Sequence, residues 1–473
     1  MSDHVFTKPE RRRVLLAACL AGFVAPLLST MANLSLVSIG EEFDAGSHLL
    51  AYVNTAFLLA SVIFMVPLCR LADIHGKRKV FLAGLAVVIV ACVLAFLSPS
   101  FWWLVACRAM MGAGSAALSS SSISLITDAY PPERRGGALG IQTMCVYTGL
   151  AIGPPLGGVL NDAIGWHALF LVVVPIALAS VACMSTVRFD VAPMEGRPFD
   201  SRGAALYGTG IALSMGGVIN LPESWALIML AAGLVFVGLF VRSQLRTADY
   251  LLNVRLFRSR VFGGSCLAAF LSYAASYSIS YFMALYLQSI GAMTATEAGM
   301  MMLIQAGIQA FLTPIFGRMS DRVADKRVLP TAGMTLTAIG VSTFMLYGTE
   351  ADLALIVVTM VLVGVGNGMF SSPNTSVIMG SVRRSETSEA SGAVSVMRQT
   401  GMMMSMGIAM MFISLIMGGS DNLVPENYGL FVDVIHISFA VCLAMCVVGI
   451  VASAMRGRET RADRESRRQS KRP

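Results

Sequence analysis

The sequence predicts an all-α membrane protein that crosses the bilayer many times. Of its 473 residues, 56% are hydrophobic and only 13% are charged, and the mean hydropathy is +0.73. A soluble globular chain rarely reaches such values, because its surface needs more charge. A charged stretch at residues 69–80 lies between two long apolar runs and is echoed at residues 317–328. Repetition of this kind indicates a polytopic protein built from two related halves.

The apolar runs give the number of spans, because each span needs ~20 mostly apolar residues to cross a hydrocarbon core ~30 Å thick. Suitable runs occupy residues 14–39, 49–68, 80–97, 101–127, 137–159, 166–184, 203–221, 225–241, 261–287, 298–316, 328–347, 353–380, 390–417 and 428–454. These fourteen runs are grouped as six, two and six. We therefore expect one six-helix bundle over residues 14–186, a linker with two extra helices over 187–260, and a second six-helix bundle over 261–454.

Basic residues indicate the orientation. All but two of the 34 Lys and Arg residues fall in the N-terminal segment 1–13, in the loops after even-numbered spans, or in the polar tail 455–473. Since Lys and Arg collect on the cytoplasmic side, we expect a protein of the cytoplasmic membrane with both termini inside. The basic cluster before the first span resembles a signal peptide, but that apolar run is too long for one and should remain as a span.

Several classes of function are disfavoured. The nine cysteines lie mostly inside apolar runs without paired spacing, so we interpret them as packing residues. We find no metal-ligand spacing, no nucleophile elbow and no phosphate-binding glycine loop, which argues against an enzyme and against ATP-driven transport. We expect no cofactor, no metal and no nucleic-acid partner. The expected partners of this monomer are the lipid bilayer, protons and a small-molecule substrate.

The repeated charged stretch combines acidic and basic residues at matched positions. Arg70 and Asp73 in the first copy match Arg318 and Asp321 in the second, and the first copy adds Gly76. The Asp can cap the following helix and accept hydrogen bonds from Arg, and the Gly permits a tight turn. Orientation of the chain alone would explain the basic cluster, but not the matched Asp.

These two copies resemble the signature cytoplasmic loop of the major facilitator superfamily of secondary transporters, although Cys69 stands where that family usually has Gly. In that family the loop braces the two halves in one conformation and releases them in another, so the resemblance implies gating by the four matched residues and Gly76. The first copy keeps Gly76, whereas the second has Ala324. We expect charge reversal at Asp73 to be more damaging than at Asp321.

The fifth span carries a glycine-rich string. Gly149, Gly153 and Gly157 fall on one helical face and would let a neighbouring backbone approach closely, while Pro154 bends the helix. Packing alone would explain the glycines. The whole string through Gly158, however, resembles the motif of drug-exporting antiporters of the superfamily, where it lies between the halves. The resemblance implies gating by these five residues and favours export over uptake.

Two basic residues lie inside spans. Arg108 begins a pattern similar to the Arg-x-x-Gln-Gly of the family, with Met111 in place of Gln, and Arg398 in the thirteenth span resembles the fourteen-helix drug/proton antiporters. The linker at residues 251–260 and the extra helix pair favour the same subgroup. An Arg inside a span usually faces a cavity or a partner, so we interpret Arg108 as a coupling or cavity residue and Arg398 as a cavity residue. A snorkelling Arg108 is the alternative.

The chain departs from the subgroup in its acidic residues. Leu28 stands where the first helix of the subgroup usually has Asp, and the span at residues 298–316 has no carboxylate. Proton coupling needs a titratable group, and binding of a lipophilic cation needs negative charge. The titratable groups that remain are Asp128, Glu389 at the start of the thirteenth span, and Asp433 with His436. Of these, the coupling candidates are Asp128, which could equally pair with an arginine of the next loop, and Asp433 with His436, which share a helical face or lie at the membrane interface.

A central cavity should lie where the second half begins. Tyr273, Tyr277 and Tyr281 recur one helical turn apart there, and phenol faces suit ligands. The spans are also rich in Met, which adapts to varied apolar shapes, although packing explains many of these residues. The other candidate cavity residues are Asn33, Arg108, Gln305, Asn374 and Arg398.

Two functions follow from these features. The leading hypothesis is a secondary transporter that exports amphiphilic organic compounds by alternating access with proton antiport. The alternative keeps the fold and changes the cargo, because two intramembrane arginines without the first-helix Asp favour anionic or neutral metabolites or lipid-like molecules, with proton coupling weak or absent.

Overall fold

The structure is a computed structural model that describes residues 6–187, 190, 196–221, 223–247, 249–323, 325–382, 387–418 and 423–455, and within these residues the regular elements are all helices. The first half comprises α1 (Lys8–Leu34), α2 (Leu36–Phe43), α3 (Ser47–His75), α4 (Lys77–Phe96), α5 (Phe101–Ala129), α6 (Pro132–Ile164) and α7 (Ala168–Ser185). The extra pair and its linker are α8 (Ser201–Ile219), α9 (Ser224–Arg246) and the 3₁₀ helix η1 (Val254–Arg258). The second half comprises α10 (Arg260–Ser276), α11 (Ser278–Ser289), α12 (Ala295–Arg322), α13 (Val328–Ser342), η2 (Thr343–Leu346), α14 (Leu353–Gly380), α15 (Thr387–Met417), η4 (Pro425–Asn427) and α16 (Tyr428–Ala454).

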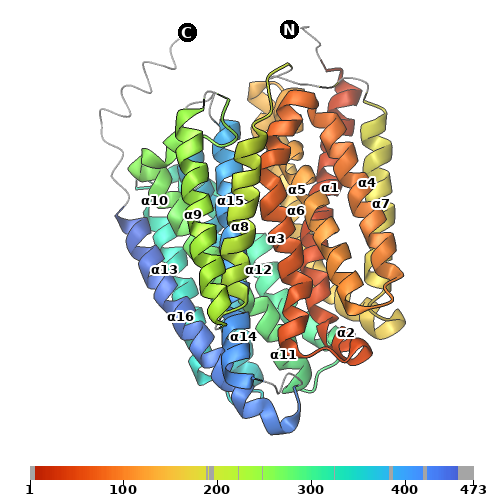
Figure 1. Ribbon diagram of the computed structural model, residues 1–473, viewed down its shortest axis with the longest axis vertical. Coiled ribbons are helices and arrows are strands. Elements are labelled where there is room, and N and C mark those ends of the chain that lie inside the picture. Colours follow the sequence, from red (N-terminus) through yellow and green to blue (C-terminus); the bar gives the residue numbers. More distant parts are fainter. Residues whose placement is uncertain are drawn as a thin grey trace.

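The long helices stand side by side in one bundle, with their loops on two opposite faces (Figure 1). We call the face at which α1 begins and α16 ends the terminal face, and the opposite one the distal face. Both charged stretches, at the α3–α4 and α12–α13 connections, lie on the terminal face. The predicted all-α polytopic fold is confirmed, and each of the fourteen predicted spans falls mainly on helical residues, in some cases on two consecutive helices.

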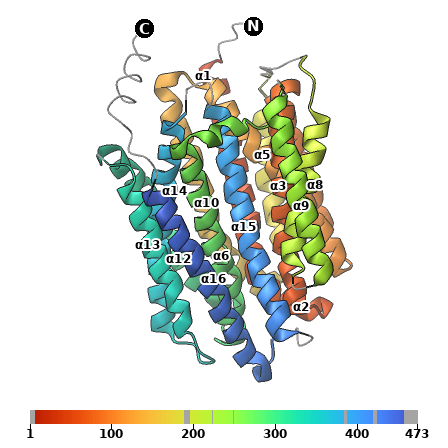
Figure 2. The ribbon, with the colours of Figure 1, turned by 60° about the vertical axis from the view of Figure 1, so that its left-hand side comes forward.

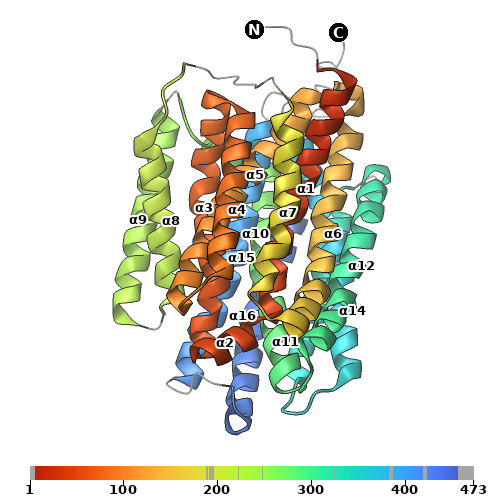
Figure 3. The ribbon, with the colours of Figure 1, turned by 90° about the vertical axis from the view of Figure 1, so that its right-hand side faces the viewer.

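Thirteen helical stretches of the described residues are long and apolar enough to cross a membrane. The one predicted span that is not among these thirteen is the seventh along the chain, α8. Its 19 residues include five glycines, which lower its mean hydropathy. α8 pairs with α9 beside α3, outside the main bundle (Figures 2 and 3). Tyr207 of α8 donates a hydrogen bond to the Val62 carbonyl of α3 at 3.0 Å, and Val218 packs on Gly407 of α15. The extra pair therefore flanks both halves.

The first predicted span is interrupted. α1 ends at Leu34 and α2 begins at Leu36. Ser35 between them lies at the edge of the right-handed helical region (φ −97°, ψ 0°), and α2 turns aside along the distal face (Figure 3). The matching span of the second half is divided at Tyr277, which nevertheless keeps helical angles (φ −72°, ψ −39°), so α10 and α11 continue as one span over 260–289. The difference is local to Ser35, where the amide reaches back to the Ala32 carbonyl in a tighter turn.

Matched glycines show the repeat at the level of packing. In the first half, a Cβ at Gly114 of α5 would lie 2.9 Å from the Gly84 carbonyl oxygen of α4. In the second half, a Cβ at Gly333 of α13 would lie 2.8 Å from the Gly366 carbonyl oxygen of α14. Lipid gives no hydrophobic drive for helix association, so close backbone approach through small residues holds each pair together.

The glycine string of α6 contacts two partners. A Cβ at Gly149 or Gly157 would lie 2.6 or 2.8 Å from carbonyl oxygens of α1, so this face packs inside the first half. Gly158 instead lies directly against the Ala295 backbone of α12, and Gly299 of α12 lies against the Pro154 carbonyl oxygen, 2.6 Å from a built Cβ. The string therefore joins α6 to α1 on one side and to the second half on the other.

Substitution at this contact should destabilise the protein. Gly158→Ala places a methyl group on the Ala295 backbone, where neither helix can yield by a rotamer change, and should cost about 1–3 kcal/mol. Gly140→Ala on the same helix meets no atom within 4 Å and should be neutral or slightly stabilising. Thermal unfolding of both purified variants measures the difference, and equal effects would contradict the packing described for α6.

Candidate functional site

A cavity of about 490 Å³ lies between the terminal-face ends of the two halves. Its walls come from α3, α5 and α6 of the first half, from α14 and α15 of the second, and from residues 250–252 of the linker. Hydroxyls gather on α5, whereas Met65, Val66 and Met379 supply apolar surface. The lining is therefore amphiphilic.

The deep end of the cavity is closed by hydrogen bonds between the halves. The Tyr147 hydroxyl of α6 lies 2.7 Å from the Ser371 hydroxyl of α14, and Gln399 of α15 donates to the Ser61 hydroxyl of α3 at 2.7 Å. Nearer the distal face, the Tyr277 hydroxyl lies 2.9 Å from the Ser29 hydroxyl. At that face the Thr296 amide donates to Asp162 at 2.7 Å. The halves thus meet in the middle and at the distal face.

Asp190 takes the capping role that the sequence suggested for Asp73. Its carboxylate accepts from the backbone amides of Arg78 at 2.8 Å and Lys79 at 3.1 Å, at the start of α4. The same carboxylate lies against Gly76, whose φ of +111° disfavours any side chain. Asp73 lines the cavity and has no hydrogen bond or ion pair within the described part of the chain. The sequence missed Asp190 because it is over a hundred residues from α4.

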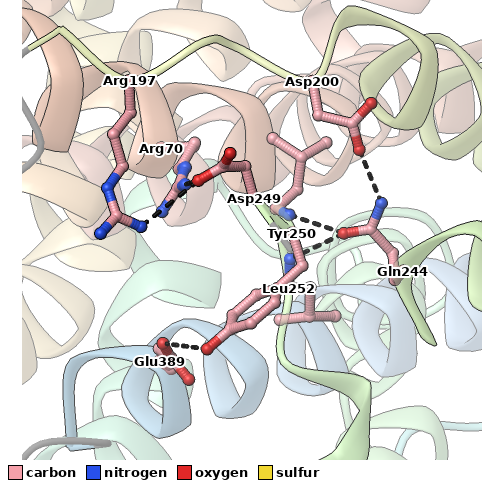
Figure 4. Close-up of polar contacts among 9 residues, drawn as sticks. Arg70, Arg197, Asp200, Gln244, Asp249, Tyr250, Leu252 and Glu389 are labelled. Atoms are coloured by element: carbon pink, nitrogen blue, oxygen red, sulfur yellow. Dashed lines mark hydrogen bonds and ion pairs between the residues drawn. The ribbon is translucent and has the colours of Figure 1, made fainter. Parts of the chain in front are cut away.

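Buried ion pairs surround the first charged stretch. Lys77 is buried, and its Nζ lies 2.6 Å from the Asp128 carboxylate, so Asp128 ties the loop to α5. Arg70 is 7% exposed and lies 3.6 Å from Asp249 of the linker, which also binds Arg197 at 3.3 Å (Figure 4). Removal of a partner from such pairs is costly, because a charge would stay buried.

The second charged stretch is more exposed. Arg318 is exposed, and the side chain of Asp321 and residue Ala324 lie outside the described part of the structure. Asp325 forms an ion pair with Arg327 at 2.8 Å within the same turn. The two copies therefore share sequence but differ in surroundings.

The linker is tied to α15 by Glu389, one of the titratable groups noted in the sequence, and to α9 by Gln244, which the sequence did not single out. Glu389 of α15 accepts from Tyr250 at 3.2 Å and from Asn253 at 2.8 Å. Gln244 accepts from the Leu251 amide at 2.6 Å and donates to Asp200 at 2.9 Å (Figure 4). Burial raises the pKa of the Tyr250 phenol, and the Glu389 carboxylate raises it further, so the phenol stays protonated and able to donate.

Arg108 is fully buried and held by neutral oxygens. It donates to the Val53 and Leu28 carbonyls, each at 2.9 Å, and to the Asn54 side chain at 3.4 Å. Its guanidinium also lies 4.8 Å above the Phe57 ring. The snorkelling alternative is therefore wrong. The backbone of Leu28, at the position where the subgroup has Asp, supplies one of the acceptors.

The other predicted residues are dispersed. Asn33 accepts from Asn54 at 2.6 Å, Asn374 donates to the Ser265 carbonyl at 3.2 Å, and the Gln305 backbone packs on Gly364. Of the tyrosines, Tyr273 faces Ser371 at 3.5 Å and Tyr277 bonds to Ser29, whereas Tyr281 is 1% exposed and packs on Phe282. None of the three phenols lines the cavity among the described residues, and each has a different partner.

The expected pair of Asp433 and His436 is not joined in the described structure. Asp433 is exposed near the start of α16, and the His436 ring bonds to the Tyr347 carbonyl at 2.9 Å. The spacing of three residues predicts that both side chains share one face of the helix. In the structure, however, the His436 imidazole bonds to Tyr347, at the end of η2, and not to Asp433.

Comparisons with known proteins agree with this architecture. The sequence profile described as Major Facilitator Superfamily matches residues 18–263 and 265–473. The chain belongs to this superfamily, and it is a transporter rather than an enzyme.

The similar curated proteins are transporters with different cargoes in their names. The chain is 22% identical to riboflavin transporter RibZ of Clostridioides difficile over 94% of this chain and 98% of that protein. It is 27% identical to multidrug resistance protein Stp of Mycobacterium tuberculosis over 82% and 73%, and 29% identical to cephamycin export protein CmcT of Amycolatopsis lactamdurans over 88% and 87%. A bacterial homolog of the human lysosomal transporter Spinster, inward-facing and occupied, has a similar fold, with a TM-score of 0.67, 18% identity, and 97% and 99% coverage.

Arg108 should behave as a structural residue. Arg108→Gln removes the bonds to three backbone or amide oxygens inside the bundle and should destabilise the protein by about 2–4 kcal/mol. Arg242→Gln removes an exposed charge on α9 and should change the unfolding temperature little. A comparable unfolding temperature for both variants would refute this role.

Glu389 should hold the linker in place. Glu389→Ala removes the acceptor for Tyr250 and Asn253, and amide hydrogen exchange over residues 249–258 should rise about 5- to 30-fold. Glu223→Ala, at an exposed position on the distal face, serves as the control. Unchanged exchange in Glu389→Ala would show that other contacts fix the linker.

Proposed function

We propose that this chain exports amphiphilic organic compounds across the cytoplasmic membrane by alternating access. The observation that carries the proposal is the amphiphilic cavity between the halves at the terminal face, above a deep end where Tyr147 meets Ser371. A compound enters this cavity and leaves on the distal side once the halves rock. The names of the Stp and CmcT relatives support export.

The orientation follows from charge. Arg70, Lys77 and Arg318 lie on the terminal face, and the positive-inside rule assigns that face to the cytoplasm. The cavity then receives its compound from the cytoplasmic side, as an exporter requires. We propose the monomer as the working unit, with bundles over residues 14–186 and 261–454 that move against each other.

In the proposed rocking motion, contacts at one face open while contacts at the other face form. At the distal side the Gly158 and Gly299 contacts hold α6 against α12, and they must separate for release. At the cytoplasmic side the two charged stretches come together as the cavity closes. Asp73, which has no ion partner among the described residues and faces the cavity, is then available to the second half.

Proton antiport is the finer part of the proposal. The described cavity lining contains the carboxylates of Asp73, Asp128 and Glu389. These groups can exchange protons with the cytoplasm when the cavity is open, and two of them are already engaged by Lys77 or Tyr250. Asp433, exposed near the distal end of α16, is placed for exchange on the other side.

The alternative cargo, an anionic or neutral metabolite, also has a specific observation in its favour. Arg108 and Arg398 lie within the spans, while the carboxylates of the sequence fall near the ends of the helices or outside them. The riboflavin transporter RibZ shows that a relative of this length is named for a metabolite.

Everted membrane vesicles test the function. Addition of a quaternary ammonium dye or of an amphipathic carboxylate should collapse a preformed proton gradient in vesicles with the protein, and to a much smaller extent in vesicles without it. Asp433→Asn should weaken the response about tenfold if this carboxylate carries the proton. Loss of cargo accumulation itself, with either class of compound, would remove export from consideration.

A control separates coupling from transport. If cargo accumulates without a change in the proton gradient, the antiport part of the proposal is wrong while alternating access stands. Unchanged coupling in Asp433→Asn would assign the proton to a cavity carboxylate.

A further inference from the structure

Arg398 of α15 is a partly buried cation inside a span. Its Nε is buried and has no hydrogen-bond partner, and the side chain forms no ion pair with any of the residues that the structure describes. A buried guanidinium normally donates to several acceptors, and a charge inside a span is costly when unpaired. A side chain in this state is well suited to bind an anion.

Three hydroxyls lie close to one another at the depth of Arg398 in the bundle. Tyr147 of α6 lies close enough for its phenol to interact electrostatically with the guanidinium. The Tyr147 and Ser371 hydroxyls lie 2.7 Å apart, and the Tyr273 hydroxyl of α10 lies 3.5 Å from the same Ser371 oxygen. Tyr147 belongs to the first half and the others to the second, so this cluster spans the interface between the halves.

The cluster lies one helical turn deeper than the cavity lining. Thr143, Thr375 and Ser395 line the cavity, and residues three or four positions away on a helix share a face. Tyr147, Ser371 and Arg398 occupy those positions on α6, α14 and α15. The guanidinium and hydroxyls therefore form the deep end that an entering compound reaches.

No carboxylate neutralises this site from its own helix. The nearest acidic residue on α15 is Glu389, roughly 13 Å away along the helix axis, where it accepts from Tyr250 and Asn253. Arg108, the other intramembrane cation, is saturated by carbonyl and amide oxygens. Arg398 is thus the intramembrane cation that has donors to spare.

We propose that Arg398, with the hydroxyls of Tyr147, Tyr273 and Ser371, binds the carboxylate of an amphiphilic organic acid. The proposal rests on the export function above and specifies its substrate class. A guanidinium binds a carboxylate with two parallel N–H···O bonds, and the hydroxyls donate to the remaining lone pairs. The apolar body of the acid lies in the cavity against Met65 and Met379.

The location also links binding to the conformational change. The carboxylate competes with Ser371 for the Tyr147 hydroxyl, which is a contact between the halves. Binding therefore weakens one of the bonds that close the deep end, whereas a neutral compound of the same shape does not.

The test uses a matched pair of fluorescent probes, 1-pyrenebutyrate and its methyl ester, with purified protein in lipid nanodiscs. Wild-type protein should bind the acid at least about tenfold more tightly than the ester. Arg398→Gln should abolish this preference and leave the affinity for the ester unchanged. Arg242→Gln, which removes an exposed charge on α9, should keep the preference.

Two further variants guard against a folding defect in Arg398→Gln. Tyr147→Phe and Ser371→Ala keep the shape of the site and should each reduce the preference for the acid about three- to tenfold. Equal affinity of the wild type for acid and ester, or a full preference in Arg398→Gln, would overturn the proposal.

Transport of the same probes separates the two hypotheses. If everted vesicles accumulate the ester or a quaternary ammonium dye but not the acid, the anion site is wrong and export stands. If they accumulate none of these probes, export is wrong as well. Accumulation of the acid that Arg398→Gln abolishes selectively supports both.

Discussion

Close backbone contact between α6 and its two neighbours joins the halves of this transporter on the distal side. Gly149 and Gly157 of the glycine string pack against the α1 backbone within the first half. Gly158 and Gly299 bring α6 and α12 together across the interface. In lipid, such contacts replace the hydrophobic effect as the source of helix association. The halves thus meet closely at the distal face, while the cavity lies between them at the terminal face.

The two intramembrane arginines differ in how many hydrogen-bond acceptors surround their charge. Arg108 is satisfied by backbone carbonyls of α1 and α3, and therefore stabilises the first half. Arg398 has a buried, unpartnered Nε beside hydroxyls of both halves. The same residue type thus has a structural role in one half and a proposed binding role in the other, because Arg108 is bonded to carbonyls whereas the Nε of Arg398 has no partner among the described residues.

The linker connects the extra helices to both halves. Asp249 binds Arg70 of the first charged stretch, and Glu389 of the second half accepts from Tyr250 and Asn253 (Figure 4). Through linker residues 249–253, these contacts connect the first half to α15 of the second half. The first charged stretch is therefore more constrained than the second, in which Arg318 is exposed.

The sequence by itself determined the fold class, the fourteen helical runs, the repeat and the superfamily, because spans need long apolar runs and their loops segregate charge. It also indicated the contacts of the glycine string. Tertiary structure decided the partners: Asp190 rather than Asp73 caps α4, and Tyr281 is buried against Phe282. The Asp190 contact joins residues that are distant in the chain, and such contacts depend on how each packed helix is oriented about its own axis. Periodicity gives a shared face, but only packing decides what that face meets.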